Sequence, residues 1–412
     1  MRYLVLGNGA AGVTAAAKLR EMDETAAITV ASAEDVPAYA KIMLPDYVGG
    51  SMERNKLFIR DGAFYEKNNI KLIKNKRAKH IDTGLSEVLF QDGSIEGYDK
   101  LLIATGSAPF IPRMEGLENI HYFTINSLME ADIIRENARP GENAVIIGGG
   151  LTGIEMAFAL RKLGMKVSIV ELNKLILQQQ LDDEASDIMT EHLKKDGIAF
   201  IGGASVSSLE ARYAEAAEKG RLPETGTAAL SNGGRLEFSM LIAAIGTRPL
   251  LDYIEGTDIK KGRGIIVDEN LKSSSDNIYA AGDAAEAAQT ANGYVSSYIW
   301  PNAMAQGKTA AINMAGGQQA FSGTSAGSNM TQLRDMQYIS MGLVKPGDDG
   351  FEILKYVDAH KFVYRKLILR NNIPVGMVLI GDVSKATEFA SLIRKGSVIT
   401  DMAGLKNNLQ SA

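Results

Sequence analysis

The sequence of 412 residues contains no cysteine and only four histidines. The lack of cysteine excludes a disulfide bond, a thiolate nucleophile and an iron–sulfur cluster held by thiolates of this chain. No two histidines stand at a spacing typical of metal ligands, so we predict no metal site. A redox reaction of this protein therefore cannot pass through a cysteine thiol or disulfide of its own.

Long apolar runs are also missing. No run reaches the length that a membrane-spanning helix needs, and no basic segment with a long apolar core opens the chain as in a secretory signal. The net charge of -5 gives no indication of a nucleic-acid partner. The length and a hydrophobic content of 45% predict a globular, cytoplasmic protein of two to four domains.

A glycine motif stands in the middle of the chain. A short apolar run, residues 144–147, leads into a G-x-G-x-x-G motif and an apolar helical pattern. A second run, residues 166–170, ends at Glu171. We predict a strand–helix–strand unit that binds a pyrophosphate at the helix N-terminus and ribose hydroxyls at Glu171. The motif glycines are Gly148, Gly150 and Gly153.

The N-terminus repeats this pattern. We predict a strand at residues 2–6, a helix at 13–22 and a strand at 27–31, with Glu34 just beyond as the ribose acid. The motif glycines are Gly7, Gly9 and Gly12. Two such units imply two dinucleotides, and the economical pair is a flavin and a nicotinamide.

Glu171 also bears on the choice of nicotinamide cofactor. Its carboxylate would repel a 2′-phosphate, so NAD(H) is favoured over NADP(H). Lys174 stands three residues further on and leaves this preference open.

The remaining patterns describe insertions and a tail. Residues 71–99 indicate a small antiparallel meander, with a hairpin signal at Asp92-Gly93. Residues 100–106 predict a buried strand that ends in a turn of small residues, and residues 238–246 show the same pattern. We also predict helices at 128–137, 183–196 and 302–315, strands at 198–208 and 277–283, and a loose hairpin at 211–234.

The composition changes after residue 317. Strands are predicted at residues 336–344, 352–357, 361–370 and 375–381, and a short helix at 386–394. Asn371-Asn372 marks a hairpin turn.

The fold class is therefore α/β: two dinucleotide-binding, Rossmann-like domains with inserted antiparallel meanders, plus a small C-terminal α+β domain. We predict a discontinuous first dinucleotide-binding domain, a second dinucleotide-binding domain and a C-terminal domain; the family resemblance given below implies that they bind FAD, bind NAD(H) and serve an interface or acceptor docking. Their bounds are residues 1–112 with 239–317, residues 113–238, and residues 318–412.

Taken together, these motifs resemble the FAD-dependent pyridine nucleotide–disulfide oxidoreductase superfamily over essentially the whole chain. Within it, the chain is most similar to NADH:rubredoxin reductases and to the flavin module of NAD(P)H nitrite reductases. Four stretches carry this likeness: residues 37–50, Gln180-Leu181-Asp182, WPNAMAQG at 300–307, and residues 364–382.

The resemblance implies roles by position. FAD would be held by the first glycine motif, the acid after it and five later positions or segments. These residues are Gly7, Gly9, Ala10, Ala11, Gly12, Glu34, Lys41, Ala78, Ala104, Thr105, Gly106, Gly282, Asp283 and Trp300. NADH would be held by Gly148, Gly150, Leu151, Thr152, Gly153, Glu171 and Gly246.

Two residues are implied to act in catalysis. Lys41 stands where family members usually have arginine, in a tyrosine-containing loop near the isoalloxazine, and its charge would favour anionic reduced flavin. Glu155 would lie near flavin N5 and the nicotinamide. The lysine that often pairs with this glutamate is replaced here by Asp46, which puts the ion pair in doubt; Lys41 is a candidate substitute.

Several of these residues also have a purely structural interpretation. Thr105 and Gly106 can form a turn without a ligand, and Lys41 can be a solvated lysine. Asp283 can cap a helix, which is compatible with FAD binding. Tyr39 is interpreted as a packing residue, and Trp300 either packs in the core or lies near the flavin.

The predicted reaction is hydride transfer from NADH to FAD, followed by electron release to a small carrier such as rubredoxin or a ferredoxin-like partner. A homodimer is possible. The alternatives are a FAD/NAD electron-transfer subunit of a larger complex, associated with a carbon monoxide dehydrogenase or a nitrite reductase, and a peroxide-forming NADH oxidase. A redox-sensing protein that binds both nucleotides without turnover is a further alternative.

Overall fold

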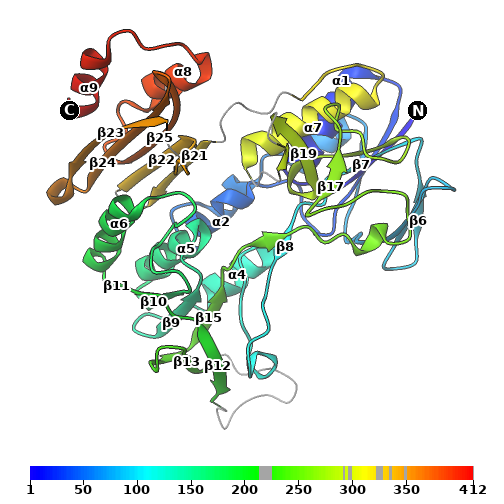
Figure 1. Cartoon of the computed structure of the whole chain (residues 1–412). Helices are drawn as coiled ribbons and strands as arrows, with labels where there is room; N and C mark the ends of the chain where they lie inside the picture. Colours follow the sequence, from blue (N-terminus) through cyan, green and yellow to red (C-terminus); the bar gives the residue numbers. More distant parts are fainter. Residues whose placement is uncertain are drawn as a thin grey trace. The chain divides into compact units, whose positions relative to one another are not determined.

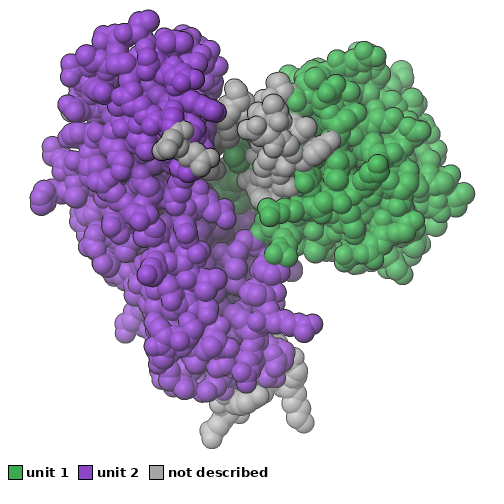
Figure 2. All heavy atoms as spheres, in the orientation of Figure 1, with its two compact units in different colours: residues 1–43, 53–108, 247–324 green, residues 44–52, 109–246, 325–412 purple. Residues whose placement is uncertain are grey.

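The computed structural model describes residues 1–212, 225–290, 293–295, 299–321, 328–333, 336–347 and 350–411, of which 288–290, 293–295 and 328–333 by backbone alone. The chain forms two compact units, shown in Figure 2. Unit 1 comprises Met1–Met43, Glu53–Ala108 and Thr247–Thr324. Unit 2 comprises Leu44–Met52, Pro109–Gly246 and Ser325–Ala412.

A five-stranded parallel sheet forms the centre of unit 1, in the order β18-β7-β1-β2-β3. Its strands are β1 (Arg2–Leu6), β2 (Ala27–Ala31), β3 (Ile70–Ile73), β7 (Lys100–Ile103) and β18 (Ile278–Ala280). β1 is buried from Tyr3 to Leu6, as expected for a central parallel strand. From β1 the chain proceeds to β2 on one side and later returns to β7 on the other. A ligand site is expected where the order reverses, at the carboxyl ends of β1 and β7.

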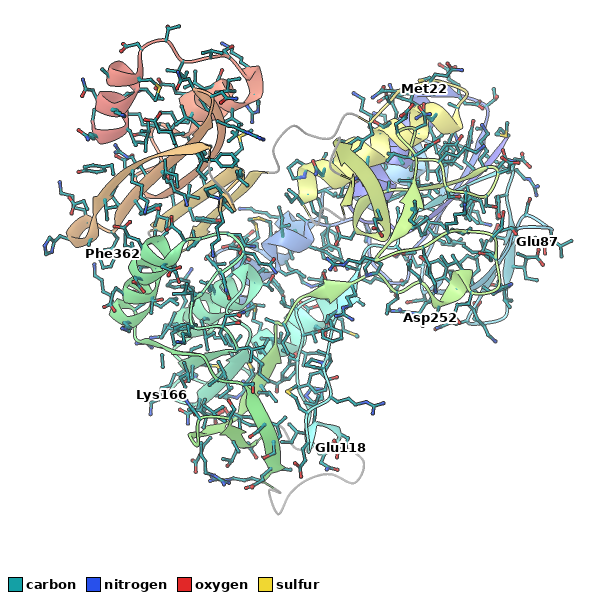
Figure 3. The ribbon with its side chains drawn as sticks, viewed as in Figure 1. Met22, Glu87, Glu118, Lys166, Asp252 and Phe362 are labelled. Carbon is teal, nitrogen blue, oxygen red and sulfur yellow. The ribbon has the colours of Figure 1, made fainter. Side chains whose placement is uncertain are left out.

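Two helices of unit 1 pack against one another in Figure 1, α1 (Ala10–Met22) and α7 (Trp300–Met314). A Cβ atom built on Gly307 would lie 2.2 Å from the backbone oxygen of Ala11, so only glycine allows this approach. Met22, at the end of α1, is labelled in Figure 3. The close packing fixes the N-terminal turn of α1 against a second helix.

The remaining elements of unit 1 are short. The predicted meander is an antiparallel sheet of β4 (Ala78–Asp82), β5 (Glu87–Phe90) and β6 (Ile95–Gly97). The prediction placed all of residues 71–99 there, but Lys71 to Ile73 belong to β3, because this strand pairs in parallel with β2. The other elements are α3 (Gly62–Lys67), β17 (Ile265–Val267), β19 (Ala285–Thr290), β20 (Gly293–Val295), and the 3-10 helices at Lys41–Met43, Arg54–Leu57, Asp252–Ile254 and Gly282–Ala284.

A second parallel sheet lies in unit 2, in the order β11-β10-β9-β15. Its strands are β9 (Asn143–Ile147), β10 (Lys166–Glu171), β11 (Ile198–Gly202) and β15 (Met240–Ala243). The order again reverses beside the first strand, so the carboxyl ends of β9 and β15 form a second expected ligand site. The helices of this part are α2 (Leu44–Val48), α4 (Leu128–Asn137), α5 (Leu151–Lys162) and α6 (Asp183–Lys195).

The prediction of a single strand at residues 198–208 was wrong. β11 ends at Gly202, and β12 (Val206–Ala211) joins a different, antiparallel sheet with β13 (Gly226–Leu230) and β14 (Arg235–Phe238). Gly203 has φ +71°, a backbone conformation that turns the chain between the two sheets. The predicted hairpin at 211–234 falls partly outside the described residues.

A five-stranded antiparallel sheet forms the C-terminal part of unit 2, in the order β21-β22-β25-β24-β23. Its strands are β21 (Ser328–Leu333), β22 (Met336–Gly342), β23 (Phe351–Asp358), β24 (Val363–Arg370) and β25 (Ile373–Gly381). Asn371 and Asn372 both have positive φ, +52° and +59°, as a tight hairpin turn requires. Two helices complete this part, α8 (Ala386–Lys395) and α9 (Met402–Gln410); neither β21 nor α9 was predicted.

The fold class predicted from the sequence is confirmed, with two parallel sheets, antiparallel insertions and a C-terminal α+β part. The helices begin earlier than predicted: α1 starts at Ala10 rather than residue 13, and α7 at Trp300 rather than residue 302. The short strands β8 (Ala108–Pro109) and β16 (Thr247–Arg248) and the 3-10 helix at Leu117–Asn119 complete the description. Among the described residues, none of the helices has the length and apolar character required to cross a bilayer.

Candidate functional site: two nucleotide cradles

The first glycine motif forms a tight turn at the end of β1. Gly7 has φ +110°, and a Cβ atom there would lie 2.1 Å from the backbone oxygen of Ala104. A Cβ atom on Gly12 would lie 1.9 Å from the backbone oxygen of Gly7. A Cβ atom on Gly9, by contrast, would meet nothing within 4 Å. Two glycines therefore pack the turn against its neighbours, and the middle one leaves open space beside the helix N-terminus.

The N-terminus of α1 suits an external anion. Its N-cap is Gly9, no side chain caps it, and its first turn carries no acidic residue. Among the described residues, four other α-helices are capped by the side chain of their N-cap residue, namely Asp61, Ser127, Asp182 and Asp401. The amide nitrogen Nδ2 of Asn8 is buried without a partner, while Oδ1 of the same residue accepts a 2.7 Å hydrogen bond from Tyr65. Uncapped N–H groups, open space and an unsatisfied buried donor fit the pyrophosphate of FAD.

Glu34 lies just beyond β2 and is held by two side chains. The hydroxyl of Tyr39 donates a hydrogen bond of 2.8 Å to Oε2 of Glu34, and Nζ of Lys41 lies 3.4 Å from Oε1. The Glu34 side chain is 29% exposed, so its carboxylate can still accept bonds from a ligand. The structure therefore places Lys41 beside the predicted ribose acid. Tyr39 does more than the packing role predicted from the sequence, because its hydroxyl orients that acid.

Asp283 lies in the 3-10 helix Gly282–Ala284, directly after β18. Its Oδ2 accepts a 2.7 Å hydrogen bond from the hydroxyl of Ser107. Burial raises the pKa of Asp283, and the hydrogen bond from Ser107 and the charge of Lys41 oppose this rise. Gly282 has φ +73° and donates its N–H to Oε1 of Gln306 at 2.7 Å. A buried carboxylate with few partners suits a ligand that brings hydroxyl donors, such as the ribityl chain of FAD.

The other residues predicted to bind FAD are distributed around this sheet. Thr105 bonds the hydroxyl of Tyr253 at 2.8 Å, and Gly106, after β7, has φ +71°, a backbone conformation that favours glycine. Ala78 opens β4 in the antiparallel insertion. Trp300 opens α7 and packs, partly buried, against the core of unit 1. The structure thus supports a packing role for Trp300 and leaves its relation to a flavin a prediction.

The second glycine motif repeats the geometry of the first. Gly148 has φ +114°, and a Cβ atom there would lie 2.3 Å from the backbone oxygen of Ala244. A Cβ atom on Gly153 would lie 2.1 Å from the backbone oxygen of Gly148. Gly150 is the N-cap of α5, and a Cβ atom there would meet nothing within 4 Å. We call each glycine turn, together with the helix N-terminus that follows it, a cradle: the first at residues 7–12 and the second at 148–153. The second cradle also has no side-chain cap and no acid in the first helical turn, so it fits a second pyrophosphate.

Glu171 ends β10, the strand whose first residue, Lys166, is labelled in Figure 3. Its Oε2 accepts a 2.7 Å hydrogen bond from the backbone N–H of Gly149. Its Oε1 accepts bonds from the backbone N–H and the side-chain amide of Asn173, at 2.9 and 2.8 Å. The carboxylate is thereby oriented beside the glycine turn, where an acid accepts the hydroxyls of a ribose.

The remaining residues predicted to bind NADH lie around the N-terminus of α5 or after β15. Leu151 is half-buried and Thr152 exposed in the first turn of α5, and Glu155 is half-buried one turn further. Gly246 has φ +116° and open space around the position of a Cβ atom.

The sequence reasoning assigned no binding role to several residues that bond the predicted ones, namely Ser107, Gly149, Asn173, Tyr253 and Gln306. Ser107 and Gly149 are sequence neighbours of predicted residues, so a wider reading of each motif would have included them. Asn173 carried a local signal, because an asparagine two residues after an acid can bond it across a turn.

Comparisons with known proteins agree with this geometry. Residues 1–307 match the family model described as pyridine nucleotide-disulphide oxidoreductase. Residues 328–397 match the rubredoxin NAD+ reductase C-terminal domain.

Individual relatives show the same likeness. The chain is 29% identical over 401 residues to a nitrite reductase [NAD(P)H] of Bacillus subtilis, covering 97% of this chain and 48% of that protein. It is 27% identical over 412 residues to an NADH-rubredoxin oxidoreductase of Clostridium acetobutylicum, covering 99% of both. A solved NAD-dependent persulfide reductase from A. fulgidus is 28% identical with a TM-score of 0.86, covering 100% of this chain and 79% of that one. The chain thus spans about half the length of the nitrite reductase but the whole of the rubredoxin enzyme.

Proposed function

The chain belongs to the pyridine nucleotide-disulphide oxidoreductase family, and we propose on this premise that it is a FAD-dependent NADH oxidoreductase. Electrons pass from NADH through FAD to a small redox carrier protein such as rubredoxin. The observation that carries this proposal is the pair of cradles, each with an open glycine at an uncapped helix N-terminus and an acid at or just beyond the second strand. FAD and NAD(H) are the cofactors.

The absence of cysteine narrows the reaction within the family. A reductase that works through a redox-active disulfide or a persulfide needs a protein thiol, and this chain has none. Electrons must therefore leave the flavin directly. The match of residues 328–397 to a rubredoxin reductase C-terminal domain supports a small iron–sulfur carrier as the acceptor.

We assign the first cradle to FAD. Gly9 and the N-terminus of α1 would hold its pyrophosphate, and Glu34, oriented by Tyr39 and Lys41, would accept the adenosine ribose hydroxyls. Asp283 would accept a hydrogen bond from the ribityl chain. When bound, FAD supplies the chemistry of accepting a hydride and releasing electrons one at a time. Ala78, Ala104, Thr105, Gly106 and Trp300 stay predicted FAD contacts.

We assign the second cradle to NADH. Gly150 and the first turn of α5 would hold the pyrophosphate, and Glu171, fixed by Gly149 and Asn173, would accept the ribose hydroxyls and repel a 2′-phosphate. Gly246, Leu151 and Thr152 stay predicted contacts of the nucleotide, and Glu155 a predicted catalytic residue. The three domain bounds, the cytoplasmic location and a homodimer also stay predictions.

A second candidate function is an electron-transfer module of a larger assembly. It is favoured by the match to about half of a nitrite reductase, which is a longer protein. In that case the acceptor would be a metal centre of a partner chain rather than a free carrier.

One experiment tests the proposed function. The purified protein should be yellow with about one FAD per chain, and NADH should bleach it in the absence of oxygen. The reduced protein is then mixed with rubredoxin, a ferredoxin and oxygen, and the rate of reoxidation is measured. Fast reoxidation by rubredoxin supports the proposal. A colourless folded protein, no bleaching by NADH, or turnover with oxygen that no carrier accelerates would contradict it.

A further inference from the structure

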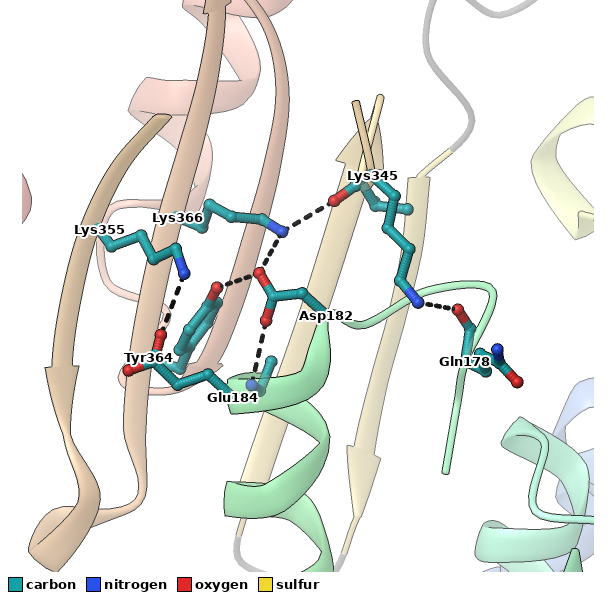
Figure 4. Close-up of polar contacts among 9 residues, drawn as sticks. Gln178, Asp182, Glu184, Lys345, Lys355, Tyr364 and Lys366 are labelled. Carbon is teal, nitrogen blue, oxygen red and sulfur yellow. Dashed lines mark hydrogen bonds and ion pairs between the residues drawn. The ribbon is translucent and has the colours of Figure 1, made fainter. Parts of the chain in front are cut away.

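One carboxylate links the C-terminal sheet of unit 2 to the nucleotide-binding part of the same unit. Asp182 is the N-cap of α6, and its Oδ1 accepts a 3.1 Å hydrogen bond from the N–H of Ala185. Its Oδ2 accepts bonds from the hydroxyl of Tyr364 at 2.5 Å and from Nζ of Lys366 at 2.6 Å (Figure 4). Tyr364 and Lys366 are residues of β24, with 0% and 1% of their surface exposed. Asp182 is thus bound to both parts of the unit.

The lysine of this ion pair is buried, with 2% of its side chain exposed, while the Asp182 side chain is 24% exposed. Lys366 also donates to the backbone oxygen of Val344 at 2.8 Å. Burial raises the pKa of Asp182, but the bonds from Lys366, Tyr364 and Ala185 outweigh it and hold the pKa below its ordinary value. A buried lysine without a partner is costly, so Lys366 strongly restrains where Asp182 can lie.

A second restraint acts on the same loop. The loop between β10 and α6, residues 172–182, starts directly after Glu171. Nζ of Lys345 donates to the backbone oxygen of Gln178 in this loop (Figure 4). Lys355 pairs with Glu184 at 3.1 Å nearby, but both side chains are largely exposed, so this third contact is expected to contribute little.

The loop is in turn bonded to the second cradle. The N–H of Leu177 donates to the backbone oxygen of Gly149 at 3.0 Å, and Gly149 donates to Glu171 at 2.7 Å. The N–H of Leu181 donates to the backbone oxygen of Leu177 at 2.8 Å. This bond closes a tight turn, and Asp182 is the next residue after it. Leu177 has φ +49°, a conformation that leucine rarely adopts unless its surroundings hold it there.

From these contacts we propose that Lys366 and Tyr364 of the C-terminal sheet are positioning residues of the NADH site, acting through Asp182 and the loop of residues 172–182. The inference rests on the proposed function, since it needs the second cradle to bind NADH. The C-terminal sheet restrains Asp182, the tight turn restrains Leu177, and Leu177 holds Gly149, whose N–H orients Glu171. Loss of the buried link leaves the glycine turn and the acid less well oriented for the adenosine half of the nucleotide.

The test uses the FAD-loaded double variant Asp182→Asn/Lys366→Met. Asparagine is as good an N-cap as aspartate, so the cap of α6 is retained at position 182. Methionine has a volume similar to that of lysine but no charge, so position 366 stays filled and the protein is expected to fold. Dissociation constants for NAD⁺ and for ADP-ribose are measured by titration calorimetry on the oxidised protein. We expect both constants to rise by about 3- to 30-fold, with KM for NADH raised and kcat at saturating NADH unchanged.

The control is Lys355→Met, which removes the exposed contact with Glu184 and should leave both constants unchanged. If the double variant does not fold, Tyr364→Phe removes one hydroxyl bond to Asp182 and should give a smaller rise in the same direction. Unchanged affinity for NAD⁺ and ADP-ribose in the folded double variant, or in Tyr364→Phe, would overturn this inference. Failure of the wild-type protein to bind either nucleotide would instead overturn the proposed function.

Discussion

The backbone N–H of Gly149 donates a hydrogen bond of 2.7 Å to Oε2 of Glu171. A Cβ atom built on Gly149 would lie 3.1 Å from both Cβ and Cγ of Glu171, so the turn and the acid are in close contact. A residue inside the glycine turn that is predicted to bind the pyrophosphate therefore also orients the acid predicted to bind the ribose. The two halves of the nucleotide site are expected to respond together to substitutions in either.

Substitution Glu171→Ala should weaken NADH binding by about 10- to 100-fold, because a hydrogen bond to a charged group contributes roughly 1.5–3 kcal/mol. NADPH should be affected much less, since its 2′-phosphate is repelled by the wild-type carboxylate. Dissociation constants for both nucleotides check this. Glu142→Ala, an exposed glutamate just before β9, is the control. Equal losses for NADH and NADPH would remove the ribose role of Glu171.

Substitution Gly150→Ser separates binding from folding. A Cβ atom at Gly150 meets no protein atom within 4 Å, and serine is a better N-cap than glycine, so Tm should stay the same or rise. The serine side chain occupies the space of the pyrophosphate and bonds the N–H groups it would use, so the dissociation constant for NAD⁺ should rise by roughly 10-fold. Flavin content should not change. The control is Gly62→Ser at the start of α3, where a Cβ atom also meets nothing within 4 Å. The same affinity for NAD⁺ in both variants would contradict the assignment of Gly150 to the pyrophosphate site.

Substitution Lys41→Ala removes the ion pair with Glu34 and a positive charge that acts on Asp283. We expect flavin reduction by NADH to slow by roughly 10-fold, or the flavin absorbance spectrum to change, because the carboxylates of Glu34 and Asp283 both lose the positive charge of Lys41. Stopped-flow absorbance measures the rate. Lys74→Ala, which breaks the pair between Lys74 and Asp35 in the same unit, is the control. An unaltered rate and spectrum would show that Lys41 does not act on the flavin.

The stability of the FAD-free protein should depend on the charge of Asp283. Burial raises the pKa of this carboxyl, so the folded state binds a proton more tightly than the unfolded state. The resulting stabilisation is present in acid, below the ordinary pKa of about 4, and is lost as the pH rises through the raised value. Asp283→Asn removes this dependence. The Tm of the variant minus that of wild type should therefore increase with pH above about 4.

Thermal unfolding of the apoprotein across this pH range measures the difference. Asp258→Asn replaces an exposed aspartate of the same unit and serves as the control. Parallel pH profiles for Asp283→Asn and wild type would show that the buried carboxyl does not contribute to the stability.

The sequence predicted both cradles well because their signals are local. Glycine spacing, an apolar strand before it and an acid after the second strand all lie within about 30 residues. The break between β11 and β12 was missed because a single glycine at positive φ redirects the chain, and an apolar run does not reveal it. The helix α9 was missed since its nine residues give only a weak periodic signal.

The partners of the predicted residues were harder to foresee. Tyr39 was interpreted as packing, yet its hydroxyl bonds Glu34, which depends on the conformation of the loop between them. Ser107 and Asp283 lie 176 positions apart in the sequence and meet only because β7 and β18 are neighbours in one sheet.

By itself, the sequence determined that two dinucleotide units exist, that each carries an acid at or just beyond its second strand, and that no cysteine thiol of this chain can take part in the reaction. These conclusions rest on composition and on short-range spacing, which the chain carries before it folds. Only the tertiary structure decided which side chains orient those acids and that Lys366 is bonded to Asp182 across 184 positions. Such contacts depend on how sheets and helices pack, because burial brings distant charged groups together only where each finds a partner.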